Sequence, residues 1–223
     1  MINANINEIF ASIQGEGRYV GEKQLFVRFS SCNLKCAYCD TMHQQGKTFS
    51  VDDLVLEIER YNQKTIHSIS LTGGEPLLWA DFINELSQKT DLKLYLETNG
   101  TMVEELKKVI KNIDIIASDI KLNSCAKQGD LFNLHEKFLE ITKENNIETF
   151  LKIVFDENIL DEEIEKCVEL ATKFDYEIFL QPKMNETTFE CDLVFAIKTF
   201  EKFKEKYSKT KFCPQMHKFW GVR

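Results

Sequence analysis

The segment Leu25-Phe-Val-Arg-Phe-Ser-Ser-Cys32-Asn-Leu-Lys-Cys36-Ala-Tyr-Cys39 runs from an apolar stretch directly into three cysteines within eight residues. The aromatic and branched side chains of residues 25–29 predict a buried strand. The cysteines then lie on the loop at the carboxyl end of that strand. In sheets of parallel strands, functional sites lie at this end. The segment therefore predicts both a strand and the position of a chemical site.

Outward from this segment, strand patterns alternate with helical ones. After residues 25–29, strands are predicted at 66–71, 92–96, 113–117, 150–155 and 176–180. Apolar residues at helical spacing fill the intervals, with Ser50 as an N-cap and a capping box from Thr101 to Glu104. Parallel neighbours need crossover connections, which the helices provide. The predicted fold is α/β, an open partial (β/α)6 barrel with mostly parallel strands.

The bulk composition narrows the class of protein. A length of 223 residues suits one domain, expected over residues 1–223. The formal charge of −8, from 28 Lys and Arg against 36 Asp and Glu, disfavours nucleic-acid and membrane-surface partners. The first ten residues lack the basic and apolar stretches of a secretion signal, so a cytoplasmic location is expected.

Three thiolates on one loop indicate an iron–sulfur centre. In a 4Fe-4S cube, Cys32, Cys36 and Cys39 would leave one iron open to a small chelating molecule with an amine and a carboxylate, as in S-adenosylmethionine. Two alternatives remain open. Structural zinc would need a fourth ligand such as His43, and a ferredoxin-like carrier would need a further cysteine such as Cys125.

The C-x3-C-x2-C spacing with an aromatic Tyr38 resembles the signature of the radical S-adenosylmethionine superfamily. A second motif, Leu71-Thr-Gly-Gly-Glu-Pro76, follows the next predicted strand. Its paired glycines leave room for a close approach of backbone, and Glu75 is able to accept hydrogen bonds from an ammonium group. This motif resembles the superfamily segment that cradles the methionine amine, whereas its ordinary interpretation is a turn.

Three more segments resemble the 7-carboxy-7-deazaguanine synthase family. They are Ser12-Ile-Gln-Gly-Glu-Gly17, Cys39-Asp-Thr41 and Pro214-Gln-Met-His217. The resemblance implies a carbon–nitrogen lyase that converts 6-carboxy-5,6,7,8-tetrahydropterin to 7-carboxy-7-deazaguanine with loss of ammonia, in queuosine or another deazapurine pathway. It also implies a 4Fe-4S cluster, S-adenosylmethionine, Mg²⁺, a flavodoxin- or ferredoxin-type reductant and a homodimer.

The same resemblance implies roles for individual residues. The N-terminal loop 12–22 and the C-terminal tail 206–223 are expected to contribute to the substrate site. Substrate contacts are expected from Ile13, Gln14, Gly15, Glu16, Arg28, Thr72 and His217. Contacts with S-adenosylmethionine are expected from Tyr38, Cys39, Asp40, Gly74, Glu75, Ser118, Asp119, Lys121, Gln181, Pro182, Lys183 and Met184, and Thr41 is expected to bind Mg²⁺.

Most other polar residues have a simpler interpretation. Glu97-Thr-Asn-Gly100 is interpreted as a turn and assigned no function. His43, His67 and His135 are expected on the surface or on loops, and Cys125, Cys167, Cys191 and Cys213 as small buried apolar side chains.

Two rival functions remain. The first is the radical enzyme that activates anaerobic ribonucleotide reductase, and the second is a non-enzymatic iron–sulfur or zinc module.

Overall fold

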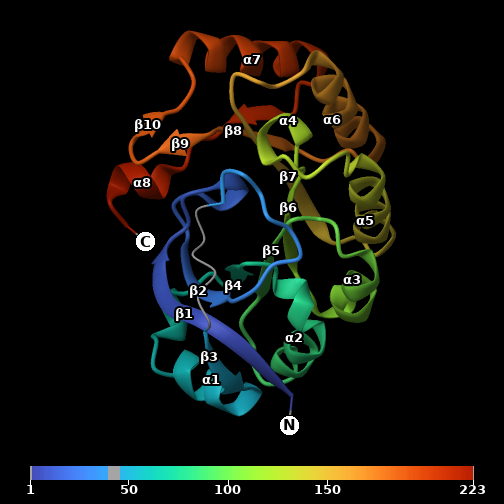
Figure 1. Ribbon diagram of the computed structural model, residues 1–223. Coiled ribbons are helices and arrows are strands. Elements are labelled where there is room, and N and C mark those ends of the chain that lie inside the picture. Colours follow the sequence, from blue (N-terminus) through green and yellow to red (C-terminus); the bar gives the residue numbers. More distant parts are fainter. Residues whose placement is uncertain (1, 40–45, 223) are drawn as a thin grey trace.

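Residues 2–39 and 46–222 are described by a computed structural model, in which one curved sheet carries helices along its outer side (Figure 1). Within these residues the strand order is β11-β8-β7-β6-β5-β4-β2-β1-β3. The middle of this order is a run of parallel pairs. Its strands are β2 (Lys23–Phe29), β4 (Ser68–Gly73), β5 (Leu94–Thr98), β6 (Ile115–Asp119), β7 (Glu148–Phe155) and β8 (Ile178–Pro182). The predicted α/β class and partial (β/α)6 barrel are confirmed.

The edges of the sheet were not predicted from the sequence. Strand β1 (Asn3–Ile13) pairs antiparallel with β2 and with β3 (Lys47–Ser50), and β11 (Thr210–Phe212) adds in parallel beside β8. A small separate hairpin joins β9 (Met184–Asn185) to β10 (Thr188–Phe189). Asparagines at positions 3, 5 and 7 weaken the strand signal of β1, since asparagine is depleted in strands.

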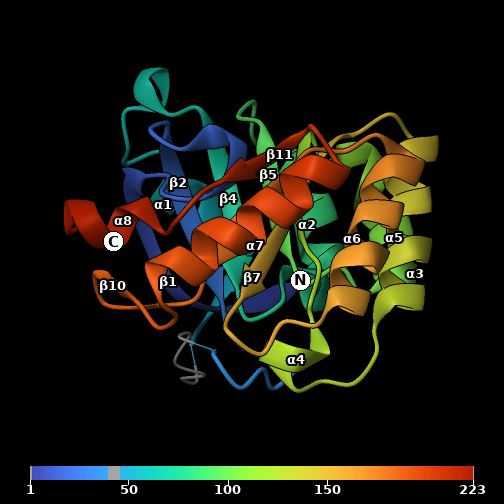
Figure 2. The same ribbon diagram turned by 90° about the horizontal axis from the view of Figure 1, so that it is seen from above.

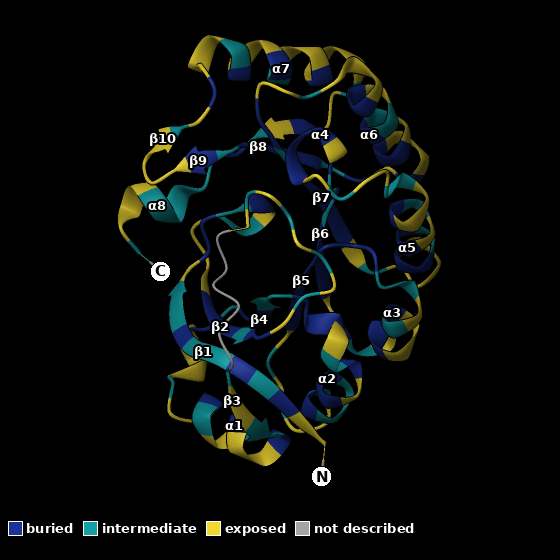
Figure 3. Cartoon of the chain, in the orientation of Figure 1, coloured by how far each residue is buried: buried dark blue, intermediate teal, exposed yellow. Residues whose placement is uncertain are grey.

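The helices bury one side against the sheet and expose the other, as Figure 3 shows for α5, α6 and α7. The longer ones are α1 (Val51–Ile58), α2 (Ala80–Ser87), α3 (Val103–Val109), α5 (Phe132–Glu144), α6 (Asp161–Phe174) and α7 (Leu193–Lys206), and the short ones are α4 (Asn123–Ala126) and α8 (Met216–Trp220). In the described residues no helix is both long and apolar enough to span a membrane.

One helix cap was predicted correctly and one was not. The Ser50 hydroxyl accepts a hydrogen bond from the Asp53 amide at the start of α1, and the Asp53 carboxylate accepts one from the Ser50 amide. The capping box predicted from Thr101 is wrong, because α3 follows Met102 and has no side-chain cap. The Thr101 hydroxyl instead donates to Asn99 Oδ1 at 2.6 Å.

The inner face of the barrel changes from apolar to polar along strands β5 to β8. Tyr95, Ala117, Phe150 and Phe179 belong to one buried cluster that also includes Ile115, Cys213, Tyr19 and Val20. Two residues further along these strands, on the same face because strand side chains alternate, lie polar groups. These are Glu97, Asp119, Lys152 and Gln181. The apolar cluster thus forms a floor below a polar layer near the carboxyl ends of the strands.

Candidate active site

A cavity of ≈ 260 Å³ opens above that floor and gathers most of the predicted site residues. Its wall includes the cysteine loop, the carboxyl ends of β4 to β8, the N-terminal loop and the C-terminal tail. The predicted residues that line it are Ile13, Gln14, Gly15, Glu16, Arg28, Cys32, Cys36, Tyr38, Cys39, Thr72, Gly74, Asp119, Lys121, Gln181, Lys183, Met184 and His217. Segments at opposite ends of the chain therefore share one cavity.

The cysteine loop is held against the paired glycines that follow β4. The Gly74 amide donates to Phe29 O at 3.0 Å, and the Glu75 amide donates to Ser31 O at 2.8 Å. A Cβ at Gly74 would lie 1.7 Å from Ser31 O, and one at Gly73 would lie 2.3 Å from Phe29 O. Two backbones approach here as closely as glycine allows. The glycines therefore bring the two motifs together as well as lining the cavity.

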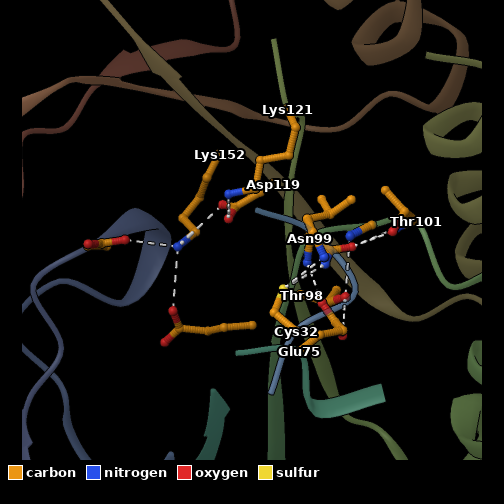
Figure 4. A network of polar contacts seen from close by, with 12 residues as sticks. Cys32, Glu75, Thr98, Asn99, Thr101, Asp119, Lys121 and Lys152 are labelled. Atoms are coloured by element: carbon orange, nitrogen blue, oxygen red, sulfur yellow. Dashed lines mark hydrogen bonds and ion pairs between the residues drawn. The ribbon is translucent and has the colours of Figure 1, made fainter. Parts of the chain in front are cut away.

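Asn99 ties the same loop to the end of β5 (Figure 4). The side-chain nitrogen of Asn99, Nδ2, donates to Asn33 Oδ1 at 2.7 Å and lies 3.7 Å from Cys32 Sγ. Its side-chain oxygen accepts from the amide and hydroxyl of Thr101. The turn interpretation of Asn99 missed this contact, and Asn99 also lines the cavity.

Glu75 is fully buried and does not line the cavity. Its carboxylate accepts from the Leu77 amide at 3.0 Å, the Asn99 amide at 2.9 Å and the Thr98 hydroxyl at 2.9 Å. Burial raises the pKa of Glu75 to about 7 despite these bonds. In this structure Glu75 therefore braces the loops after β4 and β5, and its contact with a ligand ammonium stays a prediction.

Lys152 is the centre of a buried charge cluster in the polar layer (Figure 4). Its Nζ lies 2.8 Å from Glu16 Oε2, 3.4 Å from Glu97 Oε2 and 3.5 Å from Asp119 Oδ1. Burial alone would lower the pKa of Lys152, but Asp119, Glu16 and Glu97 together hold that pKa well above its usual value. Burial alone would raise the pKa of Glu16, but Lys152 and Gln215 lower it to about 2. Lys152 and Glu16 are therefore both ionised at neutral pH.

The N-terminal loop and the C-terminal tail meet at Gly15. The Met216 amide donates to Gly15 O at 2.9 Å, and a Cβ at Gly15 would lie 2.4 Å from the His217 amide nitrogen. Gln215 Nε2 donates to Glu16 Oε1 at 2.8 Å, and His217 Nδ1 lies 3.9 Å from that oxygen. The two segments that are both expected at the substrate site thus contact each other directly.

Two cations on the cavity wall already have partners. Arg28 Nε donates to Glu8 Oε2 at 3.1 Å, across the β1–β2 pair. Lys121 Nζ lies 2.7 Å from Asp119 Oδ2 and 5.3 Å from the centroid of the Tyr38 ring. A cation over an aromatic face is attracted by the ring quadrupole. Lys121 therefore connects the end of β6 to the cysteine loop.

Comparisons with known proteins agree with this geometry. The family model described as the radical SAM superfamily matches residues 26–171. The 7-carboxy-7-deazaguanine synthase of Methanothermobacter thermautotrophicus is 31% identical over 100% of this chain and 99% of its own. The enzyme of that name from Geobacter sulfurreducens is 34% identical over 98% of this chain and 97% of its own. This chain belongs to the radical SAM superfamily and, within it, to the 7-carboxy-7-deazaguanine synthase family.

The fold of this chain is also found in a solved structure. The crystal structure of QueE from Escherichia coli matches with a TM-score of 0.67 at 21% identity, over 96% of this chain and 95% of that one.

Membership of the superfamily implies a 4Fe-4S cluster and S-adenosylmethionine, and the residues present fit both. Three thiols line one cavity, beside two glycines that also line it and whose close approach to the cysteine loop leaves no room for a Cβ. Burial raises the pKa of Cys32 and of Cys36, so metal binding must displace their protons. Cys32, Cys36 and Cys39 would hold the cluster, and the polar wall from β6 to β8 would face the nucleoside.

Some predicted residues are not among the described residues that line the cavity. Asp40 and Thr41, like His43, fall outside the described residues. Ser118 and Pro182 are buried and do not line the cavity. The Ser118 hydroxyl has no hydrogen-bond partner among the described residues and would lie 2.7 Å from a Cβ at Gly100. For these two, direct contact with S-adenosylmethionine stays a prediction.

The site includes residues to which sequence reasoning gave no function. Lys152, Glu97 and Asn99 line the cavity, and each had a detectable signal. Lys152 interrupts an otherwise apolar buried strand, where an unpaired lysine is rare. Glu97 and Asn99 end a strand whose neighbours also end at the site, so their position alone pointed there.

His135 is another correction, since it is a fully buried residue of α5 and not a surface one. Its Nε2 accepts from the Lys121 amide at 3.1 Å, so its Nδ1 carries the proton and donates to Gly100 O at 3.2 Å. Burial lowers the pKa of His135 to about 4. This neutral imidazole joins the loops after β5 and β6. The four remaining cysteines are buried, as predicted.

A pH dependence of stability follows from His135. As pH falls, the unfolded imidazole gains a proton near its ordinary pKa of 6.5, whereas the folded one does so near 4. The folded state therefore loses stability from pH 6.5 downward, by about 2 kcal/mol at pH 5. His135→Gln keeps an acceptor for the Lys121 amide but does not titrate. Urea unfolding at pH 7 and pH 5 should show a difference between the two proteins that shrinks at pH 5. An unchanged difference would contradict the buried neutral imidazole.

Proposed function

We propose that this protein converts 6-carboxy-5,6,7,8-tetrahydropterin to 7-carboxy-7-deazaguanine, with release of ammonia. The observation that carries the proposal is the shared cavity, where the cysteine loop faces Gln14, Glu16 and His217. When bound, the cluster and S-adenosylmethionine would supply one-electron chemistry for hydrogen-atom abstraction from the substrate. Nothing specific in the structure favours the ribonucleotide reductase activase or the non-enzymatic module.

The chain's own residues bind and orient the two ligands. Gln14 and Glu16 present hydrogen-bonding groups to the edge of the pterin ring, and Arg28 and Thr72 lie where the substrate carboxylate would approach the end of β4. His217, which lines the same cavity, is the remaining substrate contact. Asp119, Lys121 and Gln181, with Lys183 and Met184, provide the wall for S-adenosylmethionine. The roles of all these residues are part of the proposal.

Four further features belong to the same proposal. Thr41 would contribute an oxygen ligand to Mg²⁺, a hard cation, next to the substrate carboxylate. The chain would act as a homodimer and receive electrons from a flavodoxin- or ferredoxin-type protein. Seven cysteines with no expected disulfide framework suit a reducing, cytoplasmic location. The product would enter queuosine or other deazapurine synthesis.

The test is a reconstitution without oxygen. Protein loaded with iron and sulfide receives the carboxytetrahydropterin, S-adenosylmethionine, Mg²⁺ and a reductant, and products are identified by mass spectrometry. We expect 7-carboxy-7-deazaguanine and ammonia. Deoxyadenosine without the deazapurine would overturn the substrate assignment and favour another radical enzyme. A zinc content near one per chain without cleavage of S-adenosylmethionine would favour a zinc module.

Arg28→Ala should weaken substrate binding and leave the cluster in place. A charged hydrogen bond to a carboxylate contributes about 1.5–3 kcal/mol, so the KM for the pterin should rise by roughly 10- to 100-fold. The KM for the pterin and the iron content are measured together. Arg60→Ala, which removes an exposed arginine paired with Glu57, is the matched control and should change neither value. Loss of iron in the Arg28 variant would show that Arg28 is structural.

A further inference from the structure

Lys152 has a position that the assigned roles do not explain. It sits in the middle of β7, among residues that are otherwise apolar, and it is only 6% exposed. Its three carboxylate partners come from three separate segments, namely Glu16 of the N-terminal loop, Glu97 of β5 and Asp119 of β6. A lysine buried among three carboxylates is expensive unless all the charges remain paired.

The three partners depend on Lys152 to different degrees. Asp119 has a second cation, because Lys121 Nζ lies 2.7 Å from its other oxygen. Within residues 2–39 and 46–222, Lys152 is the sole ion-pair partner of Glu97, and Glu16 has besides it only His217 at 3.9 Å. Loss of the Lys152 charge would therefore affect Glu16 and Glu97 most.

These two carboxylates keep acceptor capacity for a ligand. An ionised carboxylate offers about four acceptor positions. Glu16 accepts from Gln215 and Lys152, and Glu97 accepts from Gln14, Ser70 and Lys152. Both residues line the cavity. A ring that carries several N–H groups, such as a reduced pterin, would supply donors for the positions that are left.

We propose that Lys152 is a positioning residue that orients Glu16 and Glu97 as hydrogen-bond acceptors for the ring N–H groups of the substrate and keeps Glu16 ionised. This inference rests on the proposed function, since the pterin supplies those donors. Lys152 acts through the carboxylates and does not itself take part in the chemistry. The site consequently selects a ring edge rich in donors.

The inference predicts a pH dependence that the native site lacks. The titratable groups facing Lys152 or its partners are Glu16, Glu97, Asp119, Tyr95, Lys121 and His217. Without the Lys152 charge, burial would raise the pKa of Glu16 toward neutrality. A protonated carboxyl loses its negative charge and turns one of its acceptor positions into a donor. Substrate binding would then weaken as pH falls. With Lys152 present, Glu16 has a pKa of about 2 and binding stays flat.

The experiment compares Lys152→Gln, which can donate a hydrogen bond but has no charge, with Lys152→Arg, which keeps the charge. The KM for the carboxytetrahydropterin is measured on reconstituted enzyme from about pH 5.5 to 8. Lys152→Gln should raise that KM on the order of 30-fold at the acid end, with recovery toward pH 8. Lys152→Arg should give a flat profile. The KM for S-adenosylmethionine and the iron content should stay near native values in both.

Two results would overturn the inference. One is a native KM and a flat profile in Lys152→Gln. The other is an equal rise of the KM for the pterin in both variants without pH dependence, which would make Lys152 a direct substrate contact or a purely structural residue. If Lys152→Gln does not fold, Glu16→Gln replaces it and should raise the KM without pH dependence. A native KM in Glu16→Gln would overturn the inference too.

Failure of the proposed function can be distinguished from failure of the role of Lys152. If native enzyme does not turn over the pterin, the charge role can still be read without substrate. Glu75, with a pKa of about 7, gives a carboxyl signal that native protein and both variants share. Infrared difference spectra of the reconstituted protein should show a further carboxyl group that gains its proton between about pH 5.5 and 8 in Lys152→Gln only. Absence of that signal contradicts the role of Lys152 regardless of the substrate.

Discussion

Cys36→Ala is expected to abolish both the cluster and the reaction. Two thiolates cannot hold a cube that needs three, so iron should fall from about four per chain toward zero. Product formation should fall below detection with it. Iron and sulfide analysis, together with the assay for the deazapurine, measures the two effects on one preparation.

The matched control is Cys167→Ala. Cys167 is a fully buried cysteine of α6 and does not line the cavity. Its loss should lower stability slightly and leave iron content and activity near native values. Equal loss of iron in the two variants would contradict the assignment of the cluster to the loop after β2.

Gly74→Ala should reduce activity on the order of 100-fold or more, as displacements near 1 Å do in active sites. The added Cβ would lie 1.7 Å from Ser31 O, so the cysteine loop or the strand end must move. The contact is with backbone, which cannot rotate away as a side chain can. Iron content, KM for S-adenosylmethionine and kcat report the displacement, and the KM should rise even where iron is retained.

Gly129→Ala tests whether any glycine replacement has this effect. Gly129 has a φ of +79°, but a Cβ there would meet nothing within 4 Å. Gly129→Ala should therefore lower stability only through backbone strain in an exposed loop, and its activity should be native. Native activity in Gly74→Ala would show that the two backbones are not held as closely as the structure places them.

The parallel strands and the cysteine loop could be predicted because their signals are local. A run such as residues 150–155, apolar except for Lys152, has a recognisable length and composition, and the spacing of Cys32, Cys36 and Cys39 is itself the motif. The antiparallel strand β1 escaped prediction, because alternate asparagines obscure its pattern and its pairing with β3 is long-range.

The charge cluster could not be predicted for a related reason. Whether Lys152 is exposed, or is buried and paired with several carboxylates, depends on Glu16 and Glu97. These residues are 136 and 55 positions away in sequence. His135 shows the same limit, since only the fold reveals that it joins two loops. Residue types indicate which chemistry is available, whereas long-range contacts decide which side chains take part.

The most direct test of one shared cavity is a label transfer. Carboxytetrahydropterin bearing deuterium on the carbon that carries the carboxylate is turned over by reconstituted enzyme, and the adenosyl group is analysed by mass spectrometry. We predict deuterium at the 5′ position of recovered S-adenosylmethionine and deoxyadenosine. Product formation with an unlabelled adenosyl group, or deoxyadenosine release that ignores the pterin, would contradict the account.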